Sequence, residues 1–523
     1  MTTPVDRATH PGLLLLLCLP LALIFYSRTL TTHFLSDDFG LIGKAATNGF
    51  FVGWGGFVRP IVVLTYVVDF TVWGLNPVGY HLTNVLLHTL NAVLVGALTA
   101  ALLRALGSEV KREIPALAAV AFLALACHTE SVAWISGRTD LVASVFMLLA
   151  LLAHVTSLET RRRSFMMFSL AAFALALLSK ESAVVFPAVV AVLTLALTRR
   201  PRIVLSSTAS LLGVLAGYAI LRRLLIGQFV GGYGTEAHMA GDAGRMVLHI
   251  VAASARVLLP PLPSPVADLL ARNWYMSPRR WLALSVGGSL LVLLMARICR
   301  TRSLGAIWRL SAALVGCFWL TIPLLGTQEV SLADTQGERF LYFPSVFVVT
   351  AAVGLAAHIS RHRRLLTIGI GACILASSVA LWDVEGTWAT AGRLSERLAT
   401  ETAALASGAV VIVANVPDTY RGAYVFRNGL PQAVTIFRHP VPSVERIEVV
   451  SSYPVSSLQE EVTIKKVDAG WSVQFLGTAG PAIRVVPDAV VLWRSAHGFG
   501  FEPTRPDTEI LSYSAGRMRK ITQ

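Results

Sequence analysis

The chain has 523 residues, of which 54% are hydrophobic and only 14% are charged, a composition that indicates a polytopic helical membrane protein. Its formal net charge is +14, but most Lys and Arg residues form short clusters at the ends of apolar runs, which argues against a nucleic-acid-binding surface. The five cysteines are scattered without metal-binding or redox spacing, so neither a disulfide framework nor a zinc site is expected.

Apolar stretches of about the length that crosses a bilayer recur from the N-terminus to residue 382. They predict about eleven membrane-spanning helices. No small-x-small cleavage site follows the first stretch before Ser36, so it is expected to be an uncleaved span. The predicted spans are residues 11–30, 81–103, 115–134, 140–157, 165–179, 183–197, 203–221, 281–297, 305–325, 340–359 and 365–382.

Basic and acidic residues alternate in the loops between these spans. Basic clusters such as residues 161–163 and 361–364 are typical of cytoplasmic loops, so the remaining loops are expected outside the cytoplasm. This predicts an integral protein of a plasma membrane, of the bacterial inner-membrane type, with its reactive side chains on the outer face. The acidic residues on that face are Asp37, Asp38, Glu130, Asp140, Glu181, Glu329, Asp334 and Glu338.

The first outer loop contains the sequence FLSDDFG, residues 34–40, with the adjacent carboxylates Asp37 and Asp38. One of the two could act as a general base while the other orients a substrate hydroxyl or a cation. Taken alone, two adjacent aspartates are more often solvated residues of a loop. The next segment, residues 55–84, mixes aromatic, polar and aliphatic side chains, which predicts a helix in the membrane interface, although the same rings could border a sugar site.

Three later outer span ends also combine acids and bases, more than membrane anchoring requires. The alternative is that each pair is a salt bridge between helices. His128 and Glu130 could ligate a divalent ion, but His-x-Glu alone provides too few ligands, so a hydrogen-bonding role is favoured for His128. The motifs are CHTESVAWISGRTD (127–140), LLSKESAVVFP (177–187) and DTQGERFLYFPS (334–345), with His128, Glu130, Arg138, Asp140, Lys180, Glu181, Glu338 and Arg339.

The apolar segment 245–259 would invert the orientation of every later loop if it crossed the membrane, so it is expected to be an interfacial or re-entrant helix on the outer face. Arg245, His249 and Arg256 share one face of that helix. Two interpretations stay open: a basic face that meets anionic head groups, or a site that binds one lipid phosphate.

After Trp382 the apolar runs become short and alternating and are separated by Pro, Gly, Asn and Asp, which predicts a β-rich (α+β) soluble domain outside the cytoplasm. The expected division is a membrane domain at residues 1–385 and this domain at residues 386–523. The runs are residues 409–416, 432–437, 446–453, 460–467, 471–477 and 482–493.

Five motifs together resemble, in order and spacing, the membrane part of the transmembrane and tetratricopeptide-repeat O-mannosyltransferases. More distantly they resemble the protein O-mannosyltransferases and other glycosyltransferases of the GT-C fold. The resemblance covers about residues 34–390, and no tetratricopeptide repeats follow it. The motifs are FLSDDF, RPIVVLTYVVDFTVWGLNPVGYHLTNVLLHTLNAVL, HTESVAWISGRTDLVASVFMLLAL, LLSKESAVVFP and GERFLYFPSVF.

The resemblance implies a GT-C-like enzyme that moves a sugar, mannose by family default, from a polyprenyl-phosphate carrier to an acceptor hydroxyl with inversion on the outer face. It implies catalytic roles for Asp37, Asp38 and Glu130, with Asp37 the favoured base. The acceptor, whether protein, glycan or glycolipid, and the part of a divalent cation stay open. The residues expected to bind the lipid phosphate or the sugar are Arg138, Lys180, Glu181, Arg245, His249, Arg256, Glu338 and Arg339.

Two alternatives to an enzyme remain at this point. A flippase or transporter of lipid-linked sugars would also be polytopic, but it predicts charges near the bilayer midplane and inverted repeats, neither of which the sequence contains. A non-catalytic envelope assembly protein would place its function in the C-terminal domain.

Overall fold

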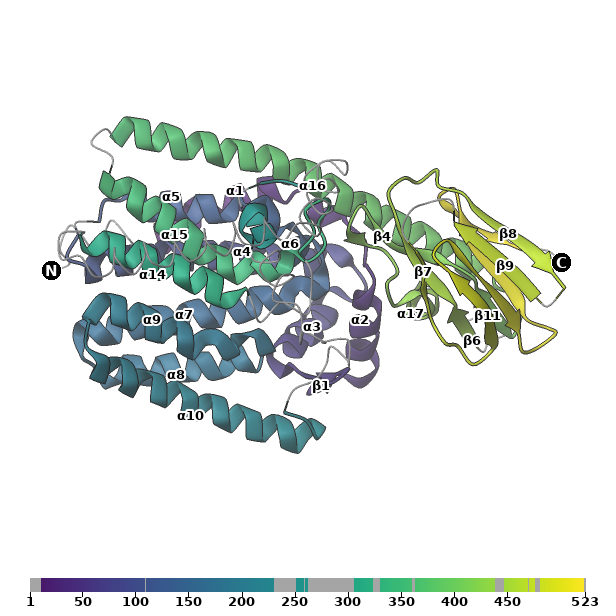
Figure 1. The fold of residues 1–523 in the computed structure, drawn as a ribbon, viewed down its shortest axis with the longest axis horizontal. Coiled ribbons are helices and arrows are strands. Elements are labelled where there is room, and N and C mark those ends of the chain that lie inside the picture. The colour runs from purple at the N-terminus through teal and green to yellow at the C-terminus, as the bar shows by residue number, and fades with distance from the viewer. Residues whose placement is uncertain are drawn as a thin grey trace, which may run out of the picture.

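The computed structural model describes residues 11–108, 110–229, 251–257, 259–261, 305–322, 330–359, 363–437, 446–468, 470–475 and 480–521. A bundle of helices occupies one side of the molecule and a strand-rich domain the other (Figure 1).

Each predicted span within the described residues coincides with a helical segment; the predicted span 281–297 lies outside them. The span predicted at residues 115–134 is broken, because α5 (Glu113–Leu123) and the following helical turns up to Ala133 meet at an angle of 58°. The unbroken helices are α1 (Pro11–Phe25), α4 (Pro77–Ala105), α7 (Arg138–Thr160), α8 (Arg163–Leu177), α9 (Phe186–Thr198), α10 (Pro201–Ile226), α14 (Ala306–Thr321), α15 (Tyr342–Ile359) and α16 (Arg363–Leu405).

Within the described residues, six helices are long and apolar enough to cross a membrane, or seven if the bent pair forms one span. Helices α1, α8 and α14 are apolar but shorter, as is α3 (Pro60–Trp73). The chain is therefore an integral membrane protein with fewer helices of full spanning length, among these residues, than the eleven crossings predicted.

The segment between α1 and α4 forms a small layer at the end of the bundle nearest the strand-rich domain (Figure 1). It contains α2 (Asp37–Asn48), an antiparallel hairpin of β1 (Gly53–Trp54) and β2 (Phe57–Val58), and α3. Proline at the first position of α3 fits a helix start, where no backbone N–H is needed. This layer and the broken helix frame the candidate site.

The C-terminal domain contains three four-stranded sheets among the described residues, in the orders β10-β7-β4-β5, β14-β13-β3-β6 and β11-β12-β9-β8. Strand β3 pairs in parallel with both β13 and β6. The strands are β3 (Val410–Val413), β4 (Val416–Tyr420), β5 (Ala423–Tyr424), β6 (Arg446–Val449), β7 (Ser451–Val455), β8 (Val462–Val467), β9 (Gly470–Phe475), β10 (Ala482–Ile483), β11 (Ala489–Ser495), β12 (Gly498–Pro503), β13 (Glu509–Ser514) and β14 (Arg517–Lys520).

The extended run predicted at residues 432–437 is wrong, because these residues lie in helix α17 (Leu430–Phe437). Pro431 stands in the first turn of this helix, where proline is tolerated. Leu430, Ala433 and Val434 are buried, which is the i, i+3, i+4 spacing of a helix face.

Helix α16 links the two parts of the molecule, running along the bundle into the strand-rich domain (Figure 1). It is 43 residues long and continuous through residue 386, so no break in the backbone marks the predicted domain boundary there. One hydrophobic core combines Phe34 and Phe39 of the first loop, Trp388 of α16, and Phe426 and Phe501 of the C-terminal domain. The strand-rich domain is thus packed against the loop that carries the acidic pair.

Candidate active site

The two aspartates of the first loop have different surroundings. Asp38 is fully buried and accepts hydrogen bonds from the backbone N–H of Leu35 (3.0 Å) and from the backbone N–H and hydroxyl of Ser136 (2.8 and 2.5 Å). Asp37 is half-buried and accepts a hydrogen bond from the side-chain amide of Asn428 at 2.9 Å. Asp38 therefore holds the loop together, and Asp37 is the carboxylate that lines a pocket.

Burial raises the pKa of Asp38 to about 7, while the hydrogen bonds from Ser136 and Leu35 oppose that rise. A carboxyl that accepts three hydrogen bonds inside the protein is not accessible to a substrate hydroxyl. The geometry thus separates the roles of the adjacent acids, a distinction that the sequence pattern alone could only propose.

The pocket that Asp37 lines has a cavity volume of about 140 Å³ and lies between α2, the β1–β2 hairpin, α3 and the turn after α6 (Thr129–Ala133). The pocket walls include aromatic rings, whose flat apolar faces lie next to charged groups. Such an arrangement can bind a sugar that carries a phosphate. Its aromatic walls are Phe51, Trp54, Phe57, Tyr66 and Trp134, and its charged lining residues are Asp37, Arg59, Lys180 and Arg339.

Two of the three lining cations are paired with carboxylates that do not themselves line the pocket. Lys180 Nζ lies 2.5 Å from Asp140 Oδ1, and Arg59 Nη2 lies 2.7 Å from Glu181 Oε2. Glu181 also pairs with Arg222 of α10 at 3.5 Å. Of the two predicted binding residues here, Lys180 reaches the pocket and Glu181 supports Arg59 from behind.

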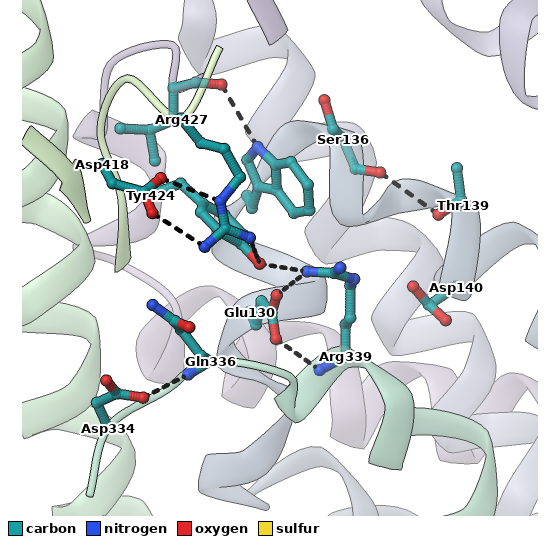
Figure 2. A network of polar contacts seen from close by, with 12 residues as sticks. Glu130, Ser136, Thr139, Asp140, Asp334, Gln336, Arg339, Asp418, Tyr424 and Arg427 are labelled. Carbon is teal, nitrogen blue, oxygen red and sulfur yellow. Dashed lines mark hydrogen bonds and ion pairs between the residues drawn. The ribbon is translucent and has the colours of Figure 1, made fainter. Parts of the chain in front are cut away.

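The third lining cation, Arg339, is held by Glu130. The buried carboxylate of Glu130 accepts the backbone N–H of Arg339 at 2.8 Å and forms an ion pair with its guanidinium. Figure 2 shows the same guanidinium between Glu130 and the hydroxyl of Tyr424, to which it donates at 2.6 Å. Glu130, predicted to be catalytic, does not line the pocket in this structure; it fixes a cation that does.

The network continues into the C-terminal domain (Figure 2). Arg427 donates to Asp418 at 3.0 Å and to the Tyr424 hydroxyl at 3.4 Å. Tyr424 is packed against the ring of Trp134, with ring centroids 4.6 Å apart. Side chains of the C-terminal domain thus reach the groups that line the pocket.

Arg138, predicted to bind the donor, is fully buried away from the pocket lining. Its guanidinium forms an ion pair with Asp69 (2.6 Å) and donates to the side-chain oxygen of Asn84 (2.7 Å) and the carbonyl of Tyr80 (2.8 Å). These partners come from α3 and α4, so Arg138 ties α7 to both helices.

Glu338 and Arg256 form a buried ion pair with each other, and neither lines the pocket. Arg256 belongs to the predicted cationic stripe, whose other members, Arg245 and His249, lie outside the described residues. The predicted site residues are therefore brought together only in part: Asp37, Lys180 and Arg339 at the pocket, with Asp38, Glu130 and Glu181 behind them.

His128 donates to or accepts from the Ser345 hydroxyl at 2.8 Å and packs among the rings of His88, Phe122 and Tyr342. This is the hydrogen-bonding role that the sequence favoured. Among the residues that the structure describes, no three His, Cys, Asp or Glu side chains gather as metal ligands.

The sequence interpretation assigned no role to Arg59, Tyr424 or Asn428. Arg59 stands directly before the proline that starts α3, but nothing in that pattern indicates that it faces a pocket. Tyr424 and Asn428 come from a domain almost four hundred positions along the chain from the acidic pair, as the separation of 391 between Asn428 and Asp37 illustrates. Only the fold brings them to the site.

The family model of dolichyl-phosphate-mannose-protein mannosyltransferases matches residues 83–225. The chain is similar to protein O-mannosyl-transferase Tmtc1 of Drosophila melanogaster, with 32% identity over 189 residues that cover 32% of this chain and 21% of that protein. It is also similar to protein O-mannosyl-transferase TMTC2 of Homo sapiens, with 36% identity over 130 residues, 25% of this chain and 14% of that protein. The chain thus spans about a fifth or less of the length of these relatives.

A crystal structure of ArnT from Cupriavidus metallidurans bound to undecaprenyl phosphate matches with a TM-score of 0.47 and 13% identity, over 83% of this chain and 89% of that chain. The family model and the relatives confirm the predicted resemblance to protein O-mannosyltransferases, for the segment that carries Glu130, Arg138 and Lys180.

Proposed function

We propose that the chain is a membrane glycosyltransferase with a GT-C-like bundle, which transfers a sugar from a polyprenyl-phosphate carrier to an acceptor hydroxyl with inversion. The observation that carries this proposal is the pocket, where one half-buried carboxylate, Asp37, shares an aromatic-walled space with three cations. Relatives named protein O-mannosyl-transferases make mannose the first sugar to test. The acceptor is a hydroxyl group of a protein, a glycan or a glycolipid.

Asp37 acts as the general base in this mechanism. Its carboxylate takes the proton of the acceptor hydroxyl while that oxygen forms a bond to the anomeric carbon. The bond between the anomeric carbon and the phosphate oxygen breaks on the opposite face, and the polyprenyl phosphate leaves with the electron pair. One displacement of this kind inverts the anomeric configuration.

The lining cations stabilise the departing phosphate. Arg59, Lys180 and Arg339 carry three positive charges into the pocket, against the single negative charge of Asp37. Fixed cations are most effective where charge develops in the transition state, because they need no reorganisation when the reaction occurs. The carboxylates behind them keep each cation in place without adding negative charge to the pocket lining.

Two of the predicted catalytic residues act through their neighbours in this proposal. Asp38 holds Ser136 and the start of α2, and Glu130 holds Arg339. Both are positioning residues, because neither lines the pocket.

The outer face is proposed from the distribution of charge along α7. This helix has 23 residues and so extends over ~35 Å, with Arg138 at the end near the site and the basic cluster 161–163 just beyond the other end. The positive-inside rule favours a cytoplasmic location for that cluster, which supports a pocket on the opposite face.

The test uses the full-length chain in lipid nanodiscs with polyprenyl-phosphate mannose as the donor and membrane extract as the source of acceptors. Free polyprenyl phosphate, measured by mass spectrometry, reports turnover whichever acceptor is used. Asp37→Asn is expected to lower kcat by about 10²-fold to 10⁴-fold, the range that a general base contributes. The matched control is Asp468→Asn, since Asp468 is an exposed acid in the C-terminal domain.

Full activity of Asp37→Asn would overturn the assignment of the base. The proposed function would be overturned if no free polyprenyl phosphate formed from donors that carry mannose, glucose or an aminosugar. Movement of the intact sugar donor between leaflets, without formation of free polyprenyl phosphate, would favour the flippase alternative.

A further inference from the structure

The loop that carries Asp37 is clamped by one turn of the C-terminal domain, residues 425–429. The backbone N–H of Ser36 donates to the carbonyl of Val425 at 3.0 Å, and the backbone N–H of Asn428 donates to the hydroxyl of Ser36 at 3.2 Å. The side-chain amide of Asn428 then donates to Asp37 Oδ1 at 2.9 Å. Three hydrogen bonds therefore join two segments far apart in the sequence.

Ser36 has an unusual backbone conformation where this turn meets it. Its φ is 47°, in the region that L-residues rarely adopt, and such a conformation persists only where the surroundings enforce it. Ser36 is also the N-cap of α2, yet its hydroxyl accepts from Asn428 rather than capping its own helix. The C-terminal domain thus substitutes for the local interactions that would normally set the start of α2.

The fit of the turn depends on close backbone approach. Gly429 has φ of 89°, and a Cβ atom there would lie 2.2 Å from the carbonyl oxygen of Ser36. Beside it, the rings of Phe39 and Phe426 are stacked with centroids 5.8 Å apart. The contact between the two segments is therefore packed as well as hydrogen-bonded.

Asn428 itself is exposed, so its side chain is not needed to fill a core. It holds one oxygen of Asp37, and among the described residues no group donates to the other, Oδ2. An amide that fixes one oxygen limits rotation of the carboxylate and leaves the second oxygen for a proton from outside.

We infer that Asn428 is a positioning residue that orients the Asp37 carboxylate, and that the C-terminal domain thereby completes the catalytic centre. The inference rests on the proposed function. It assigns the strand-rich domain a role in the chemical step. Asn428 acts on the base and not on the donor phosphate, so its loss affects kcat and leaves the KM for the donor unchanged.

The experiment compares four variants of the full chain in nanodiscs with polyprenyl-phosphate mannose. Asn428→Ala removes the amide that donates a hydrogen bond to Asp37. Asn428→Asp keeps the shape of the side chain but places a second negative charge beside Asp37. Asn428→Gln keeps an amide on a longer side chain, and Gln432→Ala removes an exposed amide on α17. Initial rates give kcat and KM, and denaturant titration gives the stability of each variant.

The expected result is a fall in kcat of about 10-fold to 100-fold for Asn428→Ala, because misplacement of a reacting group by about 1 Å can cost 10²-fold. Asn428→Asp falls further, Asn428→Gln recovers part of the activity, and Gln432→Ala matches the wild type. Donor KM and stability stay at wild-type values in all four.

Wild-type kcat in Asn428→Ala would overturn the inference while leaving the proposed function intact. Equal losses in the Ala and Gln variants accompanied by lower stability would indicate a structural role and would also overturn it. A wild-type chain that releases no polyprenyl phosphate would overturn the proposed function, and the inference with it.

Discussion

Loss of the Glu130 carboxylate tests how this residue acts on the pocket. The sequence resemblance implies a catalytic carboxylate, whereas the structure places Glu130 behind the pocket as the partner of Arg339. The substitution Glu130→Gln keeps the volume and one oxygen acceptor but removes the charge. If Glu130 acts through Arg339, the variant should lose stability and donor affinity together.

The size of the expected loss of stability follows from the burial of the two side chains. The side chain of Glu130 is 0% exposed and that of Arg339 is 12% exposed. Removing one partner of a buried ion pair costs about 3–5 kcal/mol because the other charge is left unpaired. Arg339 keeps its hydrogen bond to the Tyr424 hydroxyl and some contact with solvent, so we expect the lower end, about 3 kcal/mol. Looser placement of Arg339 should raise donor KM by about 10-fold, which corresponds to about 1.4 kcal/mol of binding.

A double-mutant cycle with Arg339→Met measures whether the two residues act as a unit. The stability losses of Glu130→Gln and Arg339→Met should overlap by about 2 kcal/mol, since contacting residues in one network are not additive. Glu461→Gln is the matched control, because Glu461 is exposed in the C-terminal domain. A fall in kcat of more than about 10²-fold, with stability and donor KM unchanged, would show a direct catalytic role and refute this reasoning.

Two further predictions concern buried charges near the pocket. Burial raises the pKa of Asp38 from 3.8 to about 7, so the folded chain binds this proton more tightly than the unfolded chain does. The stabilising effect of the protonated acid is present below about pH 4 and is lost as the pH rises through about 7, by up to about 4 kcal/mol. Unfolding titrations from pH 4 to pH 8 should therefore show a steeper decline for the wild type than for Asp38→Asn, and equal slopes would contradict the assignment. Arg138→Met should destabilise the fold by about 3–5 kcal/mol by leaving Asp69 buried without its partner, while the specific activity of the folded fraction stays near that of the wild type. Addition of Asp69→Asn should recover part of the stability, and loss of turnover in a fully stable Arg138→Met would instead support the predicted contact with the donor.

The membrane helices could be located from the sequence because hydropathy depends on composition over a window and not on partners. The extended run predicted at residues 432–437 was wrong, because six residues that begin with Gln just after Pro431 fit either period. One side of α17 packs against α2 and α16, and this burial favours the helix. The acidic pair was found as a pair, but which of its members reaches the pocket depends on Ser136 and Asn428, whose approach no local pattern encodes.

Two pairs of oppositely charged residues that are neighbours in the sequence show why local sequence patterns describe the site incompletely. The sequence left open whether Lys180 with Glu181, and Glu338 with Arg339, form salt bridges between helices or bind a substrate. In the structure the adjacent residues do not bridge each other. Their ion pairs instead join them to other segments: Lys180 to Asp140, Glu181 to Arg59, Glu338 to Arg256 and Arg339 to Glu130.

Lys180 and Arg339 form salt bridges to other segments and also line the pocket, so the salt-bridge interpretation is confirmed for both, and substrate binding by them stays a prediction. A cation next to an anionic lipid phosphate must stay charged in surroundings of low dielectric constant, and a carboxylate behind it lowers the free-energy cost of keeping that charge there. If the same carboxylates lined the pocket, they would repel the donor phosphate of the proposed function. The separation of acids from cations across the pocket wall thus leaves Asp37 as the single described carboxylate in the lining, which is the arrangement that one base and one anionic leaving group require.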